Sequence, residues 1–180
     1  ATLMGCRPSL PTTAEQWENK KLVLNAVKRE GSNLQYASET LRGDREVVST
    51  AIKGQGTAIK YAADELRGDQ ELVLQAQRRS VNAVTYASDE LRGDVDFMMK
   101  CIALDGTALR GASDELQADR ELVLAAVTKD GMALQYASKQ LRGDRDILKA
   151  AMGAGGGGRR PSLVQMASKE LGAVDTNHAK

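Results

Sequence analysis

The sequence predicts an all-α protein, an α-solenoid of about six helical hairpins that follow one another at a 25-residue step. Three observations support this fold class. One short pattern recurs at constant spacing, aromatic residues make up only 3% of a composition rich in helix-favouring residues, and the same capping residues return in each copy. Short helices repeated in this way gain their stability by stacking on their neighbours.

The repeat is read most directly from the pattern Ala-x-x-x-Leu. Its alanines are 25 residues apart in the five regular copies, at Ala37, Ala62, Ala87, Ala112 and Ala137. A sixth copy, at Ala167, arrives 30 residues after the fifth. The extra residues fall in the glycine-rich stretch near 153–160, which we interpret as a loop inserted into the last repeat.

Each repeat carries the signals of two short helices, which we term helix A and helix B. An aspartate such as Asp119 is expected to cap the start of helix A, and Asn19 takes this place in the first copy. A glycine such as Gly131 is expected to form a left-handed turn, so that helix B returns antiparallel. Gly143 then ends helix B, directly before the next capping aspartate.

One position of helix B carries a tyrosine in four of the copies, at Tyr36, Tyr61, Tyr86 and Tyr136. Stacked aromatic side chains can form either a ligand-binding row or a wall of the core, and we favour the core. The recurring Arg-Gly-Asp triplet, for example Arg42 to Asp44, joins the end of one helix to the cap of the next. Backbone requirements therefore explain this triplet without a role in cell adhesion.

The domain boundaries follow from where the repeat begins and ends. Residues 1–18 form an N-terminal arm with a possible cap, residues 19–173 form the helical-repeat array, and residues 174–180 form a C-terminal tail. Trp17 lies where the arm meets the array. It either caps the first hairpin or contacts a partner.

Three residues after the glycine-rich stretch are further candidate sites. Arg159 and Arg160 are candidates for contact with a partner. Ser162 follows them as a candidate phosphorylation site, and it also fits the N-cap of the last helix.

The charge and the titratable residues exclude several function classes. The 25 basic and 24 acidic side chains leave no net field that would attract nucleic acid. His178 is the only histidine, so histidine-based catalysis and multi-histidine metal sites are not available, and we expect no enzyme and no cofactor. The longest apolar run, 122–127, is far below the roughly 20 residues that span a bilayer, so membrane association is expected only through partners.

The repeat resembles a known family. The signature is Asp-Arg-Glu-Leu-Val-Leu-x-Ala-Val, then Gly-x-Ala-Leu-x-Tyr-Ala-Ser, then Leu-Arg-Gly-Asp, as it stands at 119–127, 131–138 and 141–144. It resembles the tandem helical repeat known as domain of unknown function 4116, over residues 19–173. The resemblance implies an array architecture and brings no catalytic residue, cofactor or assigned activity.

We therefore expect a non-catalytic scaffold that binds other protein subunits. The occurrence of the similar family in algae, and a first residue Ala1 in place of Met, favour a narrower version. In that version the chain is a linker or accessory subunit of a large organelle assembly, such as an algal photosynthetic complex, after removal of a plastid leader; otherwise it is cytoplasmic. The alternatives are a peptide-binding regulatory adaptor and a repeat domain accessory to an enzyme.

Overall fold

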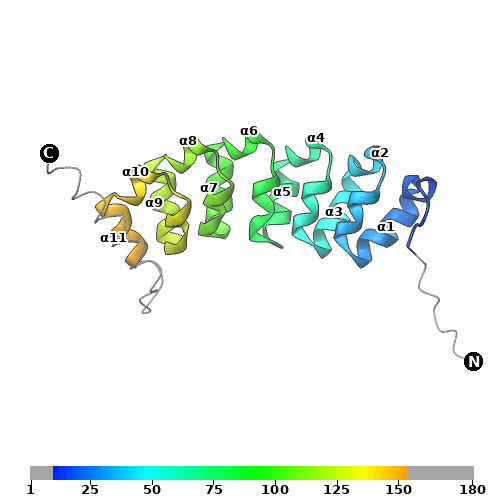
Figure 1. The fold of residues 1–180 in the computed structure, drawn as a ribbon, viewed down its shortest axis with the longest axis horizontal. Helices are drawn as coiled ribbons and strands as arrows, with labels where there is room; N and C mark the ends of the chain where they lie inside the picture. Colours follow the sequence, from blue (N-terminus) through cyan, green and yellow to red (C-terminus); the bar gives the residue numbers. More distant parts are fainter. Residues whose placement is uncertain (1–9, 154–180) are drawn as a thin grey trace, which may run out of the picture. The chain divides into compact units, whose positions relative to one another are not determined.

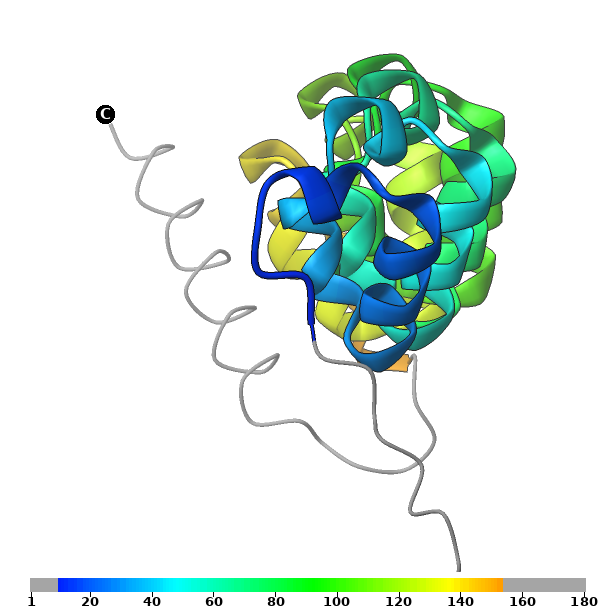
Figure 2. The same cartoon turned by 90° about the vertical axis from the view of Figure 1, so that its right-hand side faces the viewer.

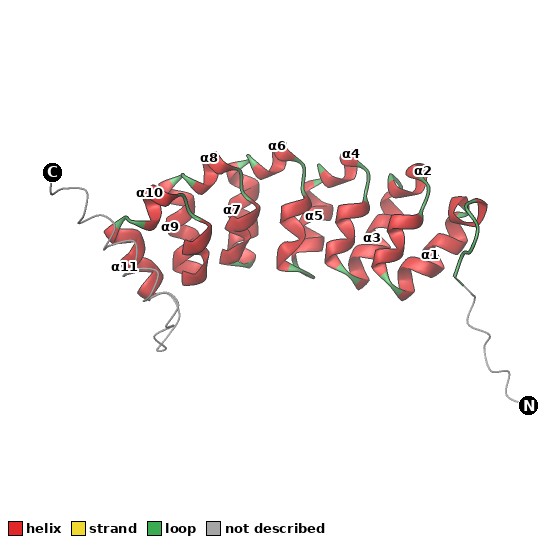
Figure 3. Cartoon of the chain, viewed as in Figure 1, coloured by secondary structure: helices red, strands yellow, loops and turns green. Residues whose placement is uncertain are grey.

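The computed structural model describes residues 10–153, and every regular element in this range is a helix (Figure 3). The all-α repeat fold is thus confirmed. The chain divides after Tyr86 into two compact units, which we call unit 1 and unit 2.

In unit 1 two complete repeats each consist of a long α-helix, a 3-10 helix and a short α-helix, in that order, and a third repeat begins with a long α-helix and a 3-10 helix. A 3-10 helix, η1 (Glu15–Glu18), precedes the first repeat. The long helices are α1 (Lys20–Arg29), α3 (Arg45–Gly54) and α5 (Gln70–Gln77). The 3-10 helices are η2 (Gly31–Tyr36), η3 (Gly56–Tyr61) and η4 (Val81–Tyr86), and the short helices are α2 (Glu39–Arg42) and α4 (Asp64–Arg67).

Unit 2 contains the same succession of helices. Its long helices are α7 (Val95–Leu104), α9 (Arg120–Lys129) and α11 (Arg145–Gly153). Its 3-10 helices are η5 (Gly106–Gly111) and η6 (Gly131–Tyr136), and its short helices are α6 (Asp89–Arg92), α8 (Asp114–Gln117) and α10 (Lys139–Arg142). The long helices correspond to helix A of the repeat.

Helix A begins where the sequence predicts. The Asp44 carboxylate accepts hydrogen bonds from the Glu46 and Val47 amides at 2.9 and 3.2 Å, and Asp119 accepts one from the Leu122 amide at 2.8 Å. These bonds satisfy amide groups that the first helical turn leaves free. The predicted caps are therefore confirmed in both units.

Helix B is not continuous, contrary to the prediction. Its first half is a 3-10 helix and its second half is a short α-helix, with an extended Ala-Ser step between them; Ala137, for example, has φ −70° and ψ 157°. The extended step lets the Ser138 amide donate to the Gln117 carbonyl oxygen of the preceding repeat at 2.8 Å. In unit 1 the Ser38 amide donates to the Trp17 carbonyl oxygen at 3.2 Å. A bond between repeats replaces one within the helix.

The glycines that follow helix A are required by close packing and not by a left-handed turn, which corrects the expected reason for them. A Cβ atom on Gly31 would lie 2.6 Å from the Ala51 carbonyl oxygen, and one on Gly106 would lie 2.5 Å from that of Ala126. Neither glycine has a left-handed backbone. Successive repeats approach so closely here that any side chain would collide with main chain.

The tyrosine row does not line the core, so that prediction is wrong. Tyr36 is 57% exposed, and Tyr61, Tyr86 and Tyr136 are half-buried. The core of each repeat is formed instead by aliphatic side chains of helix A and of the 3-10 helix, such as Ile52 in unit 1.

The repeats of each unit stack side by side. In unit 1 the helices α1, α3 and α5 form one row, and η2, η3 and η4 form a second row against it; Figure 1 shows the first row from the side and Figure 2 shows it from the α1 end. In unit 2 the helices α7, α9 and α11 pack in the same way, with η5 and η6 against them. Each helix A keeps one face that the 3-10 helices do not cover, which we call its outer face.

Candidate interaction surface

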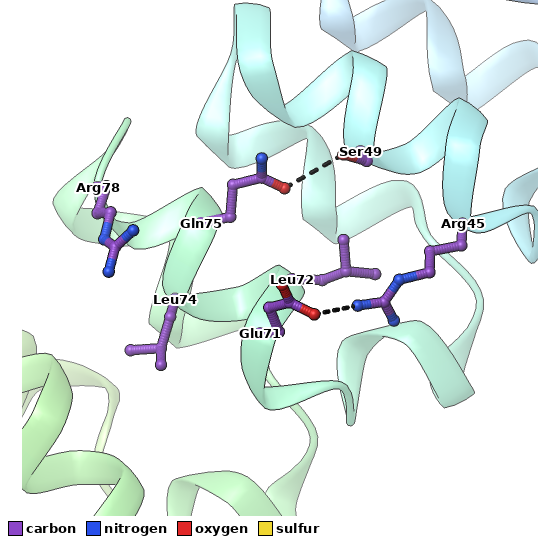
Figure 4. Close-up of a pocket in the computed structure, with 7 residues that line it drawn as sticks. All are labelled: Arg45, Ser49, Glu71, Leu72, Leu74, Gln75 and Arg78. Carbon is purple, nitrogen blue, oxygen red and sulfur yellow. Dashed lines mark hydrogen bonds and ion pairs between the residues drawn. The ribbon is translucent and has the colours of Figure 1, made fainter.

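The outer face of unit 1 has a hollow of about 400 Å³ between α3 and α5, and polar groups bridge it. It is lined by Arg45, Ser49, Glu71, Leu72, Leu74, Gln75 and Arg78 (Figure 4). The Arg45 guanidinium donates to Glu71 at 2.7 Å, and the Ser49 hydroxyl donates to Gln75 Oε1 at 3.2 Å. These two bridges join the helices across the hollow.

The bridge made by Arg45 belongs to a series of ion pairs that repeats along helix A. In α1, α3 and α9 the first residue of the helix is basic, and it pairs with the capping aspartate and the second helical residue of the next repeat. The helices α5 and α7 begin with Gln70 and Val95 instead. Lys20 Nζ lies 2.7 Å from Asp44 and 2.8 Å from Glu46, and Arg120 lies 3.7 Å from Asp144 and 3.0 Å from Asp146. The sequence shows this series as a basic residue directly after the capping position.

The ion pairs lower the pKa of the capping carboxylates in unit 1. Partial burial by itself raises the pKa of Asp69, but hydrogen bonds from the Leu72 amide and from Arg45 outweigh it, so this pKa lies below its ordinary value. The pKa of Asp44 is lowered in the same way, with Lys20 as the cation. Both carboxylates are thus held in the charged form that caps the helix best.

The equivalent hollow of unit 2, between α7 and α9, is larger and mostly apolar. Its volume is about 600 Å³, and it is lined by Ile102, Ala103, Glu121, Leu124, Ala125, Thr128 and Lys129. Two repeats after Arg45 and Ser49, the sequence places Val95 and Met99, and Ala125 replaces Gln75. Neither polar bridge of unit 1 can therefore form here.

Large apolar side chains are also exposed on the long helices of unit 2, although none of them is among the residues that line the hollow. Val95 is 48% exposed, Met99 42% and Leu104 42%, all on α7, and Met152 on α11 is 55% exposed. These four belong to unit 2, whereas only two large exposed apolar side chains, Leu10 and Tyr36, lie among the described residues of unit 1. Val95 and Met99 lie on the same side of α7 as Ile102 and Ala103, which line the hollow, because three, four, seven or eight residues separate them along the helix. Exposed apolar side chains beside an apolar hollow are typical of an interaction site. We call Val95, Met99, Leu124 and Ala125 the α7–α9 face.

Sequence reasoning missed this face. Its signal was the segment from Val95 to Leu104, which is apolar around most of the helix and cannot bury all of its apolar residues against one neighbouring row. The inner side of α7 is core in any case, because Phe97 and Met98 are fully buried.

The candidate sites from the sequence fall elsewhere. The Trp17 ring lies 5.3 Å from that of Tyr36, centroid to centroid, and is half-buried against the first repeat. Arg159, Arg160 and Ser162 lie outside the described residues, and their roles stay predictions.

Two kinds of chemical group, metal ligands and the buried cysteine, can be assessed in the part of the chain that the structure describes. Residues 10–153 contain no cluster of His, Cys, Asp and Glu side chains that could hold a metal ion. Burial raises the pKa of the Cys101 thiol to about 12, so this side chain stays protonated. That the chain is not an enzyme stays a prediction.

The comparisons with known proteins concern the repeat alone. The family model described as domain of unknown function (DUF4116) matches residues 19–67, 50–92, 69–117, 94–142 and 119–171. No match was found among curated proteins or among solved structures. Within residues 10–153, no helix has both the length and the apolar character needed to cross a membrane.

Proposed function

The chain belongs to the DUF4116 repeat family, and from that premise we propose that it is a non-catalytic protein–protein interaction scaffold. The observation that carries this proposal is the α7–α9 face. A helix pair that keeps Val95 and Met99 exposed leaves apolar area in water that a partner could cover.

The repeat architecture supports this role. Exposed residues of the outer face contribute much less to stacking than the buried residues do, so they can vary without loss of the fold. Three equivalent residues of unit 1, Arg45, Ser49 and Gln75, are polar and form bridges between α3 and α5, which indicates that apolar residues at these positions are not needed for folding. The proposal includes, as its narrower form, a linker or accessory subunit of an organelle assembly such as an algal photosynthetic complex, which rests on the family resemblance alone.

The proposal is tested by a pull-down with matched variants. Leu124→Lys places a charge in the hollow of unit 2, and Leu74→Lys places it at the equivalent position of unit 1. The tagged chain, expressed in its source cells and isolated under native conditions, should retain a protein in fixed stoichiometry by mass spectrometry. Leu124→Lys should lose that protein and Leu74→Lys should keep it. Recovery of free chain alone, or equal recovery by both variants, would contradict the proposal.

A further inference from the structure

The α7–α9 face lacks a cation at a place where other repeats provide one. In unit 1 the guanidinium of Arg45 pairs with Asp69 and Glu71, and in unit 2 Arg120 pairs with Asp144 and Asp146. The residue at this position of α7 is Val95, whose side chain is half exposed. The series of ion pairs is therefore interrupted at α7 in unit 2, as it is at α5 in unit 1, which begins with Gln70.

Two acidic side chains lack an ion-pair partner as a result. Asp119 and Glu121 occupy the positions of the repeat that Asp144 and Asp146 occupy in the next repeat. Neither Asp119 nor Glu121 takes part in an ion pair within the described part of the chain. Asp119 still caps α9 through the Leu122 amide. Glu121 lines the apolar hollow together with Leu124, and Lys129 is the other charged residue in its lining. A carboxylate at the edge of an apolar hollow favours a ligand that brings a positive charge to it.

The described part of unit 2 is acidic. Residues 87–153 contain 9 basic and 12 acidic side chains, a net charge of −3, and the whole of unit 2, residues 87–180, contains 13 basic and 14 acidic side chains, a net charge of −1. A second copy of this chain, docked with its α7–α9 face against the same face, would bring like charges together. The α7–α9 face therefore suits a basic partner better than a second copy of this chain.

Resting on the proposed function, we propose that the α7–α9 face binds an amphipathic helix of a partner protein. This helix lays its apolar side chains in the hollow between α7 and α9, as a third helix packs against two others. It places an arginine or lysine against Asp119 and Glu121, and so supplies from outside the cation that Val95 lacks.

The test uses designed peptides and the full chain. Two labelled helical peptides of about 14 residues share one leucine stripe. One carries a single arginine beside the stripe, and the other carries glutamine at that position. Fluorescence anisotropy should show that the chain binds the arginine peptide about fivefold more tightly at low salt.

Two variants examine the charge pair and two examine the apolar contact. Glu121→Gln and Val95→Arg should each remove most of the preference for arginine, since the first deletes the anion and the second restores the internal cation. Leu124→Lys should weaken binding of both peptides about tenfold, and Leu74→Lys in unit 1 should change neither. Circular dichroism checks that all variants are folded.

Several results would overturn the inference. Equal affinity of wild-type chain for the two peptides, or an arginine preference that survives in Glu121→Gln, would contradict the charge pair. A dimer in sedimentation experiments that Leu124→Lys abolishes would identify a second copy as the occupant. If neither peptide binds while Leu124→Lys still loses a partner in the pull-down, this inference fails and the proposed function stands.

Discussion

Units 1 and 2 have the same succession of helices. They differ in the side chains that lie between neighbouring helices A on the outer face. The helices α3 and α5 are bridged by Arg45 with Glu71 and by Ser49 with Gln75. Between α7 and α9 those bridges are absent and an apolar hollow takes their place. The repeat thus fixes the fold with its inner positions, and its outer positions are free to acquire a function.

The largest expected effect distinguishes the two sides of α7. In a Cys6→Ser background, Cys101 should react with a thiol reagent at least about a hundredfold more slowly than a cysteine introduced by Met99→Cys. Cys101 is fully buried with a pKa raised to about 12, whereas Met99 is 42% exposed. Alkylation followed by mass spectrometry measures both rates. Similar rates would mean that α7 does not have a buried and an exposed side.

A second prediction concerns the packing that the units share. Gly31→Ala in unit 1 and Gly106→Ala in unit 2 should each lower the free energy of unfolding by about 2 kcal/mol, because each new methyl group would press on a main-chain carbonyl. Gly54→Ala is the control, since a Cβ atom there meets nothing within 4 Å. It should be neutral or slightly stabilising. Urea denaturation measures all three, and a cost at only one of the two units would contradict their common packing.

A third prediction follows from the ion pairs of unit 1. Because the pKa of Asp69 is lowered in the folded chain, its contribution to stability is present above its ordinary value of 3.8 and is lost as the pH falls through the folded-state value. Asp69→Asn should therefore lose less stability than wild type between about pH 5 and about pH 2. Melting temperatures across this range test it, and parallel curves would show that folding does not lower the pKa of Asp69.

The smallest expected effect concerns the exposed guanidinium group of Arg45. Arg45→Gln should lower the melting temperature by no more than about 2 °C at low salt, and the difference should vanish at about 1 M NaCl. Val95→Arg, which restores the missing cation in unit 2, should produce a similar small increase. A decrease on Val95→Arg would show that the equivalent position does not face Asp119 and Glu121.

The start of helix A was predictable because its cause is local. A capping aspartate bonds amides two and three residues away, so Asp44 and Asp119 reveal their role in the sequence itself. The division of helix B was not predictable from the sequence, because its Ala-Ser step is held by a hydrogen bond to the preceding repeat. Ser138 before a short run ending in Leu141 was nevertheless a capping signal, because its hydroxyl accepts from the Leu141 amide at 3.4 Å.

The candidate surface depends on knowing which side of each helix is covered. The helical period shows that α7 is apolar on more than one side, but it does not say which side a neighbour buries. The structure assigns Phe97 to the core and Met99 to the outer face, although both are large and apolar and lie two residues apart. Tyr36 illustrates the reverse case, an aromatic residue expected in the core that lies outside it.

The central claim is that the outer face of unit 2 binds protein and that of unit 1 does not. Equivalent positions test it most directly when a photo-crosslinking amino acid replaces Met99 in one variant and Ser49 in another, in source cells. We predict that illumination links a partner protein to the chain through position 99 and not through position 49. Crosslinks of equal yield at both positions, or at position 49 alone, would contradict the claim.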